Sequence, residues 1–467
     1  MDSESDARTA LPIVALVGRP NVGKSTLFNR LIGARIAVVE DFPGTTRDRI
    51  YGELEWRGRA FALVDTAGIA WRDPEPVAAA AVHQAEIAAA EADLLLVVTD
   101  VRTGPTDLDQ NVSRAVRRAG RPHLLVVNKA DSQTQRDDVA EFFGLGLGSP
   151  YAISALHGTA TGELLDGIVA RLPTVEVADP EDERPRFVIA GRPNVGKSSL
   201  LNALLGHERA LVHETPGTTR DSIDTLMTWE GREFWLIDTA GMRRRGHVEP
   251  GVERHSVLRA VRSVQRADVG ILVSDAGEGA AAQDAHIAGL LLEAAKGLVI
   301  VANKWDLVQD PSARDEAERG LQRMLHFAPE SPLMRISALT GRNVRNVIPA
   351  AFDVYAARQT RVPTPKLNRF LREWVGRRDS PAKRGRRARF KYGTQVAANP
   401  PTFLLFFSNP EIVHPSYVRY LENGLRDEFS LPPHGAGPRP PRRGLKSSRS
   451  FSSKAFDDWF GMASSST

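Results

Sequence analysis

The sequence predicts an α/β protein with two tandem domains, each a mostly parallel sheet flanked by helices, followed by a smaller α+β domain. At 467 residues, the chain exceeds what one hydrophobic core usually serves. A set of short motifs occurs twice in the same order, and apolar runs alternate with helical stretches in each half. Buried parallel strands are near-continuous apolar runs, so the alternation indicates a buried parallel sheet in each half.

The predicted strands come in matching groups. Apolar, β-rich runs cover residues 13–17, 93–98 and 123–127 in the first half, and residues 187–190, 269–273 and 298–301 in the second. A helical stretch at residues 76–91 separates two of the runs in the first half. This alternation of strands and helices is typical of α/β domains.

Five motifs recur with their order preserved, which indicates duplication of a self-sufficient domain. Gly18-Arg-Pro-Asn-Val-Gly-Lys24-Ser25-Thr26 returns as Gly191-Arg-Pro-Asn-Val-Gly-Lys197-Ser198-Ser199, and Pro-Gly-Thr-Thr-Arg-Asp at 43–48 returns at 216–221. Asp-Thr-Ala-Gly at 65–68, Asn-Lys-x-Asp at 128–131 and Ser-Ala-Leu at 154–156 return at 238–241, 303–306 and 337–339. Solenoid repeats are much shorter, about 20 to 50 residues.

These positions divide the chain into six segments. We expect a disordered N-terminus at 1–11, a first repeated domain at 12–172 and a second at 186–358. A linker rich in proline and acidic residues covers 173–185, the third domain 359–434, and a flexible basic tail 435–467.

The composition excludes several classes of protein. With 42% hydrophobic and 25% charged residues, the chain has the composition of an ordinary globular protein. The absence of cysteine excludes disulfides and thiolate metal sites. The first residues are acidic where a signal peptide would be basic, and no apolar run approaches the roughly 18 residues of a membrane span. We therefore expect a cytoplasmic protein without a membrane span.

Gly-x4-Gly-Lys-Ser, after a strand and before a helix, predicts a phosphate-binding loop in each copy. Successive backbone N–H groups of such a loop can surround a phosphate. We expect Lys24 and Lys197 to contact the β- and γ-phosphates, and Ser25 and Ser198 to ligate Mg²⁺. The other predicted nucleotide contacts in these loops are Gly18, Gly23, Thr26, Gly191, Gly196 and Ser199.

Two further motifs predict groups around the γ-phosphate and the metal. Asp65 and Asp238 each end an apolar run, which places a carboxylate at the end of a strand, facing the phosphates as a metal-site group. Gly68 and Gly241 are expected to offer backbone N–H groups to the γ-phosphate. Thr46 and Thr219 are expected to contact the phosphate and the metal from a mobile loop, the alternative being a surface threonine in a turn. Lys24, Thr46 and Gly68, with Lys197, Thr219 and Gly241, form the predicted catalytic set.

Asn-Lys-x-Asp after a buried strand predicts selection of guanine. The carboxylates of Asp131 and Asp306 can accept two N–H bonds from the guanine edge, a pair of donors that adenine lacks. We expect Asn128 and Asn303 to brace neighbouring loops, and Lys129 and Lys304 to lie along the base. A backbone N–H from Ser154-Ala155 and from Ser337-Ala338 would reach the guanine carbonyl. Each copy is therefore predicted to bind GTP or GDP.

The residue after the glycine of Asp-Thr-Ala-Gly lacks a side chain that could hold the attacking water. Many GTPases have glutamine there, whereas this chain has Ile69 and Met242. Phosphoryl transfer depends on positioning and on charge stabilisation. We therefore expect slow hydrolysis unless another group stabilises the transition state.

Together these residues resemble the bacterial double-G-domain GTPases of the Der or EngA family, within the TrmE-Era-EngA-like class, over roughly residues 13–429. The most telling parts are the duplicated phosphate loop, Gly-Met-Arg-Arg-Arg-Gly at 241–246 leading into 252–259, Phe-Lys-Tyr-Gly-Thr-Gln at 390–395 and Phe-Phe-Ser-Asn-Pro at 406–410. The resemblance implies that the third domain is KH-like and packs between the G domains. It also implies nucleotide-dependent action in assembly of the 50S ribosomal subunit, with rRNA and ribosomal proteins as partners, no DNA and a monomeric chain.

The resemblance extends to a candidate potassium site. Asn21 and Asn194 resemble the asparagines that hold K⁺ in related GTPases without the glutamine, where the cation supplies the charge that an arginine finger gives elsewhere. The alternative is an asparagine that only stabilises the turn.

Basic residues crowd the start of the third domain. Between 361 and 391 they are Arg361, Lys366, Arg369, Arg372, Arg377, Arg378, Lys383, Arg384, Arg386, Arg387, Arg389 and Lys391, opposed only by Glu373 and Asp379. Such a cluster suits RNA phosphates, the alternative being a solvated basic loop. The segment has no Gly-x-x-Gly, so the usual KH backbone clamp is absent.

The chain departs from the family after residue 427. Family members continue into a short closing strand, whereas residues 431–441 here are rich in proline, which leaves few N–H donors for a strand. We expect the third domain to lack that strand. The basic, serine-rich tail is expected to be flexible in isolation and to add contacts with RNA phosphates.

Two other functions remain open at this stage. A GTPase of tRNA modification or general signalling would normally carry a single G domain. A passive RNA-binding scaffold would have decayed nucleotide sites, whereas the lysines, serines and aspartates of both copies are intact.

Asp306→Asn is expected to weaken selection of GTP in the second G domain and to leave phosphate binding largely intact, because separate loops hold the base and the phosphates. A site that must satisfy a buried charged acceptor rejects the wrong ligand by roughly 10⁴-fold to 10⁵-fold. The measurement compares binding of GTP and xanthosine triphosphate at that site. An unchanged preference for GTP would refute the role assigned to Asp306.

Overall fold

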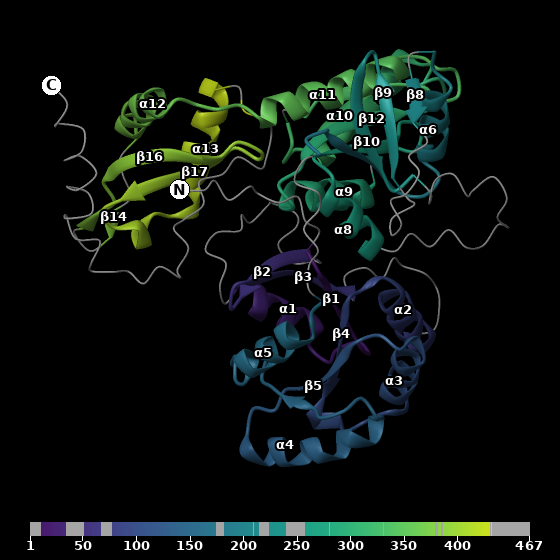
Figure 1. The fold of residues 1–467 in the computed structure, drawn as a ribbon, viewed down its shortest axis with the longest axis vertical. Helices are drawn as coiled ribbons and strands as arrows, with labels where there is room; N and C mark the ends of the chain where they lie inside the picture. Colours follow the sequence, from purple (N-terminus) through teal and green to yellow (C-terminus); the bar gives the residue numbers. More distant parts are fainter. Residues whose placement is uncertain are drawn as a thin grey trace.

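The computed structural model describes most of the three predicted domains. The described residues are 11–33, 51–66, 77–173, 182–208, 210–213, 224–239, 257–279, 281–329, 331–378, 382–383, 386–429 and 431. Figure 1 shows the first repeated domain below, the second above it, and the third domain beside the second. All of the predicted N-terminal segment 1–11 except residue 11 lies outside the described residues. So do the predicted tail 435–467 and the residues after 431 where no closing strand is expected.

The first domain is a six-stranded sheet with helices on both faces. Its strand order is β2-β3-β1-β4-β5-β6, parallel except for the antiparallel pair β2–β3. The strands are β1 Ile13–Val17, β2 Tyr51–Trp56, β3 Arg59–Asp65, β4 Leu94–Asp100, β5 His123–Asn128 and β6 Tyr151–Ala152. The helices are α1 Lys24–Gly33, α2 Val77–Glu91, α3 Asp107–Ala119, α4 Gln133–Asp137 and α5 Thr161–Arg171, with 3₁₀ turns at Val101–Thr103 and Asp138–Leu145.

The second domain repeats this plan, and its described residues form a seven-stranded sheet. Its order is β13-β12-β11-β7-β10-β9-β8, with antiparallel pairs at β10–β9 and β9–β8. The strands are β7 Arg186–Ala190, β8 Ala210–His213, β9 Thr225–Trp229, β10 Arg232–Ile237, β11 Val269–Asp275, β12 Gly297–Asn303 and β13 Leu333–Arg335. The helices are α6 Lys197–Leu205, α8 Val257–Arg266, α9 Ala282–Glu293, α10 Pro311–Met324 and α11 Val347–Arg358, with a 3₁₀ turn at Val344–Asn346.

The central strands of both sheets are buried along their whole length, as the apolar runs predicted. All seven residues of β4 are buried, and so are all seven of β11 and of β12. Each of these strands ends in a polar residue, namely Asp100, Asp275 and Asn303. The carboxyl ends of neighbouring parallel strands lie along one edge of a sheet, so these polar groups collect where α/β domains bind their ligands.

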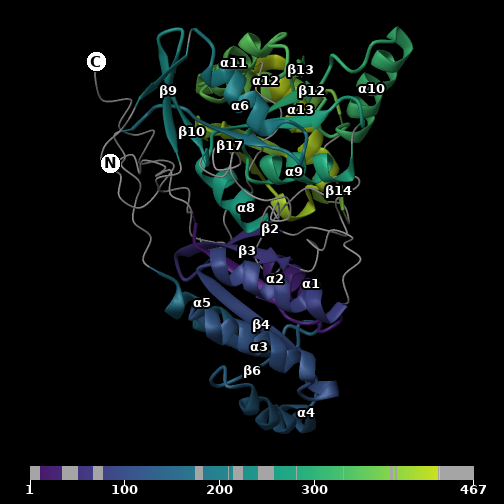
Figure 2. The ribbon, with the colours of Figure 1, turned by 90° about the vertical axis from the view of Figure 1, so that its right-hand side faces the viewer.

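Helix α8 joins the two repeated domains. One continuous cluster of buried apolar side chains includes Ile13 and Tyr51 of the first domain together with Leu258, Val261 and Val264 of α8. Arg262 Nη2 donates to the carbonyl oxygen of Glu91 at 2.9 Å and to Asp93 Oδ2 at 3.0 Å. Figures 1 and 2 both show α8 at the lower edge of the second domain, facing the first. The junction is therefore apolar at its centre, with charged pairs around it.

The third domain has two helices on one side of a β-hairpin. It consists of α12 Thr364–Gly376, the short pair β14 Ala382–Lys383 and β15 Arg386–Arg387, the antiparallel pair β16 Phe390–Ala397 and β17 Thr402–Phe407, a 3₁₀ turn at Pro410–Ile412, and α13 Pro415–Phe429. The buried amide of Asn368 on α12 exchanges two bonds with the backbone of Gly393, at 2.7 and 2.8 Å. The Asn368 side chain thus satisfies the backbone N–H and carbonyl groups of Gly393 in β16, as a neighbouring strand would.

The third domain contacts the second domain through a set of buried polar groups. Arg358, at the end of α11, is 2% exposed, and its Nε donates to Asn399 Oδ1 of the β16–β17 connection at 3.1 Å. Asn399 Nδ2 in turn donates to Asp268 Oδ1 at 3.3 Å. A buried polar chain therefore fixes this domain to the second one.

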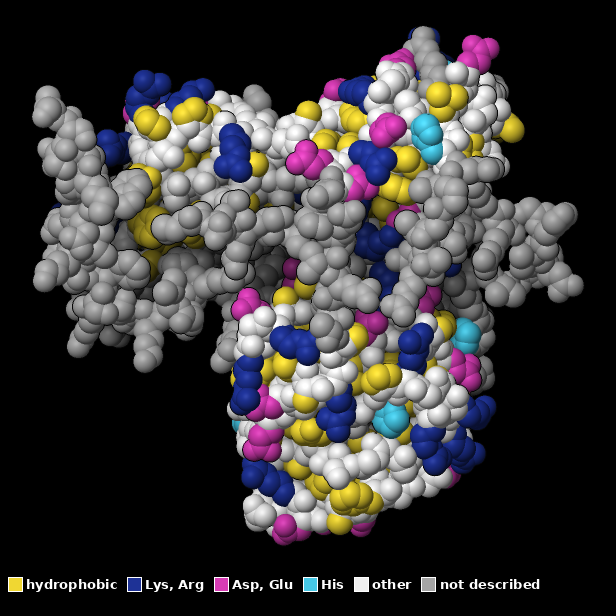
Figure 3. Space-filling model, in the orientation of Figure 1, with side chains coloured by type: hydrophobic (Ala, Val, Ile, Leu, Met, Phe, Trp, Pro, Cys, Tyr) yellow, Lys and Arg dark blue, Asp and Glu magenta, His cyan; other side chains and the backbone are white. Residues whose placement is uncertain are grey.

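The exposed basic residues of the third domain lie on α12, directly after its end, and on or beside β15 and β16. Arg369, Arg372 and Arg377 are exposed, and Figure 3 shows Lys and Arg side chains gathered on this part of the surface. In the described part of the chain, no helix is both long and apolar enough to span a bilayer.

Arg358→Met is expected to lower the free energy of unfolding by about 1–3 kcal/mol, the cost of leaving a buried acceptor such as Asn399 Oδ1 without its donor. Burial lowers the pKa of Arg358 to about 10, with nearby Asp268 acting in the opposite direction, so the side chain is charged at neutral pH. Thermal unfolding and limited proteolysis of the third domain provide the measurement. Arg361→Met, an exposed arginine three residues later, is the control, and equal losses in both variants would contradict the interpretation.

Candidate nucleotide-binding sites

Each predicted phosphate loop joins the end of a central strand to the start of a helix. The first loop runs from the end of β1 at Val17 to the start of α1 at Lys24. Gly18 and Gly23 have φ angles of +143° and +93°, and a Cβ atom on them would lie 2.3 Å from the carbonyl oxygen of Val98 and 2.4 Å from Asn128 Nδ2. In the second loop the equivalent distances are 2.3 Å for Gly191 and 2.2 Å for Gly196. Both glycines of the motif are therefore required by close contacts with neighbouring strands.

The lysine of each loop lies against the loop's own backbone. Lys24 Nζ donates to the carbonyl oxygens of Gly18 at 2.7 Å and Arg19 at 2.8 Å, and Lys197 Nζ donates to those of Gly191 at 2.8 Å and Arg192 at 2.5 Å. Burial lowers the pKa of Lys24 to about 8, and Asp65 opposes this shift. The ammonium group of each lysine is thus buried against two carbonyl groups of its own loop, within a loop of the kind that binds phosphate.

The asparagine of Asn-Lys-x-Asp connects two loops in each domain. Asn128 Nδ2 donates to the carbonyl oxygen of Val22 at 2.9 Å, and its Oδ1 accepts from the backbone N–H of Ala155 at 3.0 Å. Asn303 makes the same pair of bonds, to Val195 at 2.8 Å and from Ala338 at 2.9 Å. The backbone N–H groups of Ala155 and Ala338, which are predicted to reach the guanine carbonyl, donate to these asparagines in this structure.

The lysine of Asn-Lys-x-Asp is also anchored in both copies. Lys129 Nζ lies 2.6 Å from Asp100 Oδ2, at the end of β4, and 2.8 Å from the carbonyl oxygen of Asn21. Lys304 Nζ lies 2.6 Å from Asp275 Oδ2 at the end of β11. The ammonium group of each lysine is therefore held at the carboxyl end of a central strand.

The predicted guanine-selecting carboxylates have different surroundings. The Asp131 carboxylate accepts hydrogen bonds from Ser154 Oγ and from Arg102 Nη2, both at 2.6 Å. These bonds lower the pKa of Asp131, and the bond from Ser154 makes the largest contribution. In the second domain, Asp306 Oδ1 is buried and has no hydrogen-bond partner among the described residues. The residue at the position of Arg102 is Gly277, 175 residues later, the separation that also relates Asn128 to Asn303.

The predicted metal-site groups also differ between the copies. Ser25 Oγ donates to Asp65 Oδ2 at 2.5 Å, so a hydroxyl and a carboxylate of the first domain face each other. In the second domain, the Ser198 hydroxyl oxygen is buried and unpartnered among the described residues. The Asp238 carboxylate is bound by Arg259 and Ser263 of α8. Hydroxyl and carboxylate oxygens are ligands that Mg²⁺ prefers, so both sets fit that ion.

The positions of residues with positive φ angles are repeated in the two domains. Ten non-glycine residues of the described chain have positive φ, and eight form pairs at equivalent positions of the two domains. These pairs are Asn21 and Asn194, Arg57 and Glu230, Lys129 and Lys304, and Ala160 and Asn343. Two pairs lie at the predicted nucleotide contacts, where costly backbone conformations commonly concentrate. Asp238 differs, because its counterpart Asp65 does not have positive φ.

The structure brings most predicted site residues together but leaves some outside its described part. Gly18, Asn21, Lys24, Ser25, Asp65, Asn128, Lys129, Asp131 and Ser154 meet at the carboxyl ends of β1, β3 and β5. In the second domain Gly191, Lys197, Asn303 and Lys304 repeat the equivalent contacts, whereas Ser198 Oγ and Asp306 Oδ1 have no partner among the described residues. Thr26 and Ser199 lie in the first turns of α1 and α6. Thr46, Gly68, Thr219 and Gly241, with Ile69 and Met242, lie outside the described residues.

Sequence reasoning missed two arginines at these sites. Arg102 contacts Asp131 from the turn after β4, and Arg259 contacts Asp238 from α8. Aligning the two copies would have singled out Arg102, because the second copy has a glycine there. Arg259 ends the stretch 252–259 that carries part of the family resemblance, but its contact spans 21 residues and depends on how α8 docks, so the sequence did not assign it a partner.

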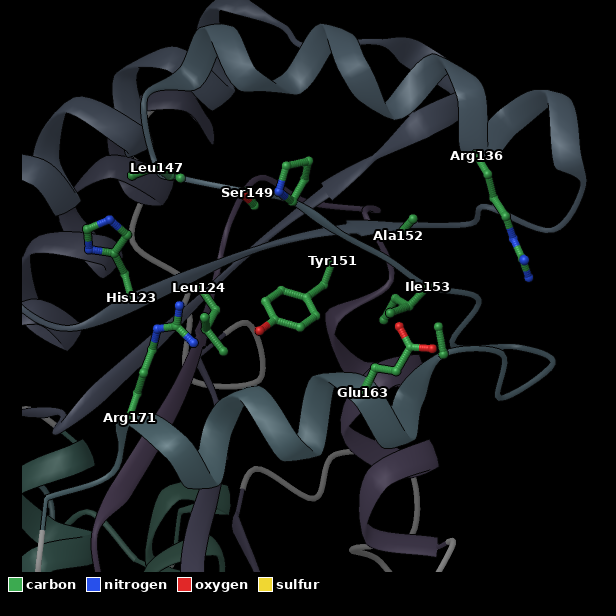
Figure 4. A pocket seen from close by; sticks show the side chains of 13 residues that line it. His123, Leu124, Arg136, Leu147, Ser149, Tyr151, Ala152, Ile153, Glu163 and Arg171 are labelled. Carbon is green, nitrogen blue, oxygen red and sulfur yellow. The ribbon is translucent and has the colours of Figure 1, made fainter.

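One cavity lies away from both sites. It has a volume of about 530 Å³ and is lined at the edge of the first sheet by residues of β5, β6 and α5. Figure 4 shows Tyr151 pointing into it, between Arg171 and Glu163. None of the residues lining it is a predicted nucleotide contact.

Comparison with known proteins identifies the same three parts. The family model for 50S ribosome-binding GTPases matches residues 13–129 and again 186–304, and the model for the C-terminal KH-domain-like part of EngA bacterial GTPases matches 361–433. The GTPase Der of Chloroflexus aggregans is 49% identical over 90% of this chain and 95% of its own length. The GTPase Der of Thermomicrobium roseum is 48% identical over 90% and 94%.

Among solved structures, the chain resembles Era in complex with MgGDPNP and a segment of 16S ribosomal RNA. The two are 25% identical, with a TM-score of 0.29 over 45% of this chain and 74% of that one. This likeness covers less than half of the chain, whereas the Der relatives match nearly all of it. With two G domains and a KH-like domain in the same order, the chain belongs to the Der (EngA) family of ribosome-binding GTPases, which hydrolyse GTP.

Proposed function

We propose that both G domains bind GTP through the residues described above, and that the chain acts on the 50S subunit in a nucleotide-dependent way during its assembly. The observation that carries this proposal is the repetition of one contact pattern. In each domain a buried asparagine ties the phosphate loop to the base loop, and a buried lysine lies within the phosphate loop. Decay of either site would have removed this pattern, so the passive scaffold is disfavoured.

Mg²⁺ is part of this proposal. Ser25 and Asp65 would hold the ion in the first domain and Ser198 and Asp238 in the second, with Thr46 and Thr219 completing each set. When bound, the ion neutralises charge on the β- and γ-phosphate oxygens. The chain's own part is to place the phosphates against Lys24 or Lys197 and to hold the base at Asp131 or Asp306.

A monovalent cation is the second element of the proposal. Asn21 and Asn194 have φ angles of +65° and +63°, and both are exposed in the phosphate loops. Their side chains would hold an additional cation beside the phosphates, which would offset the absence of a water-holding glutamine. K⁺ in this position supplies charge at the developing transition state.

The partner is the 50S subunit, contacted through rRNA and ribosomal proteins, and the chain works as a cytoplasmic monomer. The exposed arginines of α12 are suited to the phosphate backbone of RNA. Binding that depends on such contacts weakens as salt concentration rises.

Co-sedimentation with purified 50S subunits is expected to differ between a non-hydrolysable GTP analogue and GDP, because the γ-phosphate changes the loops around it. The experiment compares the bound fraction in the two nucleotide states at two salt concentrations. Equal binding in both states would exclude nucleotide-dependent action, and binding to 30S subunits alone would exclude the assigned partner.

Hydrolysis is expected to run faster in K⁺ than in Na⁺, and Asn21→Ala and Asn194→Ala are each expected to reduce that difference at their own site. The measurement is the GTP hydrolysis rate in matched potassium and sodium buffers. Equal rates in both salts, together with unchanged rates in the two variants, would end the potassium proposal without affecting the GTP sites.

A further inference from the structure

The carboxylate of Asp238 is bound by α8, the helix that also contacts the first G domain. Arg259 Nε lies 3.1 Å from Asp238 Oδ1 and 2.9 Å from Oδ2, and Arg259 Nη2 also donates to Oδ1. Ser263 Oγ, one turn later on α8, donates to Oδ2 at 3.1 Å. A forked, charge-assisted contact of this kind fixes both the direction and the position of a carboxylate.

Among the described residues of the first domain, the positions equivalent to Arg259 and Ser263 do not carry side chains that could make this contact. Because β4 begins at Leu94 and β11 at Val269, Arg259 and Ser263 correspond to Gln84 and Ala88 of α2. Neither residue can form a charged fork with a carboxylate. In that domain Asp65 faces Ser25 at 2.5 Å, whereas Ser198 in the second domain has no hydrogen-bond partner among the described residues.

The backbone of Asp238 has an unfavourable conformation that contacts from other residues stabilise. Its φ angle is +62°, in the left-handed region that non-glycine residues rarely adopt and that costs about 1 kcal/mol or more. Its backbone N–H donates to Asp224 Oδ1 at 3.1 Å, and Arg266 of α8 binds Asp224. Asp65, the counterpart, does not have positive φ. Contacts from α8 therefore stabilise a conformation that the first domain does not use.

The same helix is fastened to the first domain three residues further along. Arg262 lies 3.0 Å from Asp93, which also accepts the backbone N–H of Ile13 at 2.8 Å. Gln265 Nε2 donates to the Tyr51 hydroxyl oxygen at 3.3 Å. A shift of α8 against the first domain therefore moves Arg259 as well, because all these residues lie on one rigid ten-residue helix.

We propose that Arg259 is a positioning residue for the metal site of the second G domain, holding Asp238 away from Ser198 while α8 is docked on the first domain. This inference rests on the proposed role of Ser198 and Asp238 at Mg²⁺. Release of Asp238 from Arg259 turns the carboxylate towards Ser198, as Asp65 faces Ser25. The second domain then retains Mg²⁺ and nucleotide more weakly when α8 is docked than when α8 is displaced.

The test uses the full chain carrying Asp131→Asn, with the first site filled by xanthosine diphosphate, so that fluorescent GDP reports the second site alone. The measured quantity is the Mg²⁺ concentration at which GDP release is half-maximally slowed. Arg259→Gln is expected to lower this midpoint about twofold to fivefold, the range for losing a competing, partly exposed ion pair. Arg259→Lys keeps the positive charge but cannot form the forked contact, so its midpoint is expected to lie between those of the unmodified chain and Arg259→Gln.

A matched control separates this effect from general damage. Arg319→Gln replaces an exposed arginine on α10 of the same domain and is expected to leave the midpoint unchanged. Arg262→Gln loosens α8 from the first domain without touching Asp238 and is expected to lower the midpoint in the same direction. If Arg259→Gln fails to fold, Ser263→Ala provides the same comparison with a smaller expected shift.

The possible failures are distinguishable. If Ser198→Ala leaves the Mg²⁺ dependence of GDP release intact, the proposed metal site itself is wrong. If Ser198→Ala abolishes that dependence while Arg259→Gln leaves the midpoint unchanged or raises it, the positioning role is overturned. If Arg259→Gln lowers the midpoint but Arg262→Gln does not, the link through α8 to the first domain is overturned.

Discussion

The buried carboxamide of Asn128, repeated by Asn303, is the contact on which each nucleotide site depends. Its nitrogen binds the phosphate loop and its oxygen binds the base loop, so one side chain sets the distance between the two. The same contact requires glycine at 23 and 196, because any Cβ there would lie within 2.4 Å of the asparagine nitrogen. Each bond left unmade in such a buried position costs about 1–3 kcal/mol, which ties the two motifs to each other.

The two copies share this framework and differ in the side chains that bind the carboxylates of their sites. In the first domain an arginine and a serine contact the carboxylate of Asp131, whereas Asp306 has a buried oxygen without a described partner. At the proposed metal sites, the carboxylate of Asp238 is bound by α8, whereas that of Asp65 faces Ser25. Partly exposed ion pairs are worth about 0–1 kcal/mol, enough to change an affinity severalfold. Duplicated folds can therefore bind the same nucleotide with different strength.

The second G domain is the centre of the described structure. It contacts the first domain through the apolar face of α8, and it holds the KH-like domain through Arg358, Asn399 and Asp268. Asp268 lies just before β11, and Arg186 of β7 donates its backbone N–H to the same carboxylate at 2.9 Å. The KH-like domain is therefore attached next to the central strands of that sheet.

The sequence by itself determined the duplication, the central strands and the nucleotide motifs. Buried parallel strands need apolar residues along their length, and close backbone contacts need glycine, so these constraints leave local patterns such as residues 13–18 and 191–196. The contacts of Arg102, Arg259 and Arg358 left no such pattern, because an arginine in a turn or on a helix is compatible with many partners. Only the docking of α8, and of the third domain against the second, decided which acceptors they bind. The tertiary structure therefore determined how two nearly identical sites came to differ, since that difference arises from side chains brought together by packing rather than by spacing along the chain.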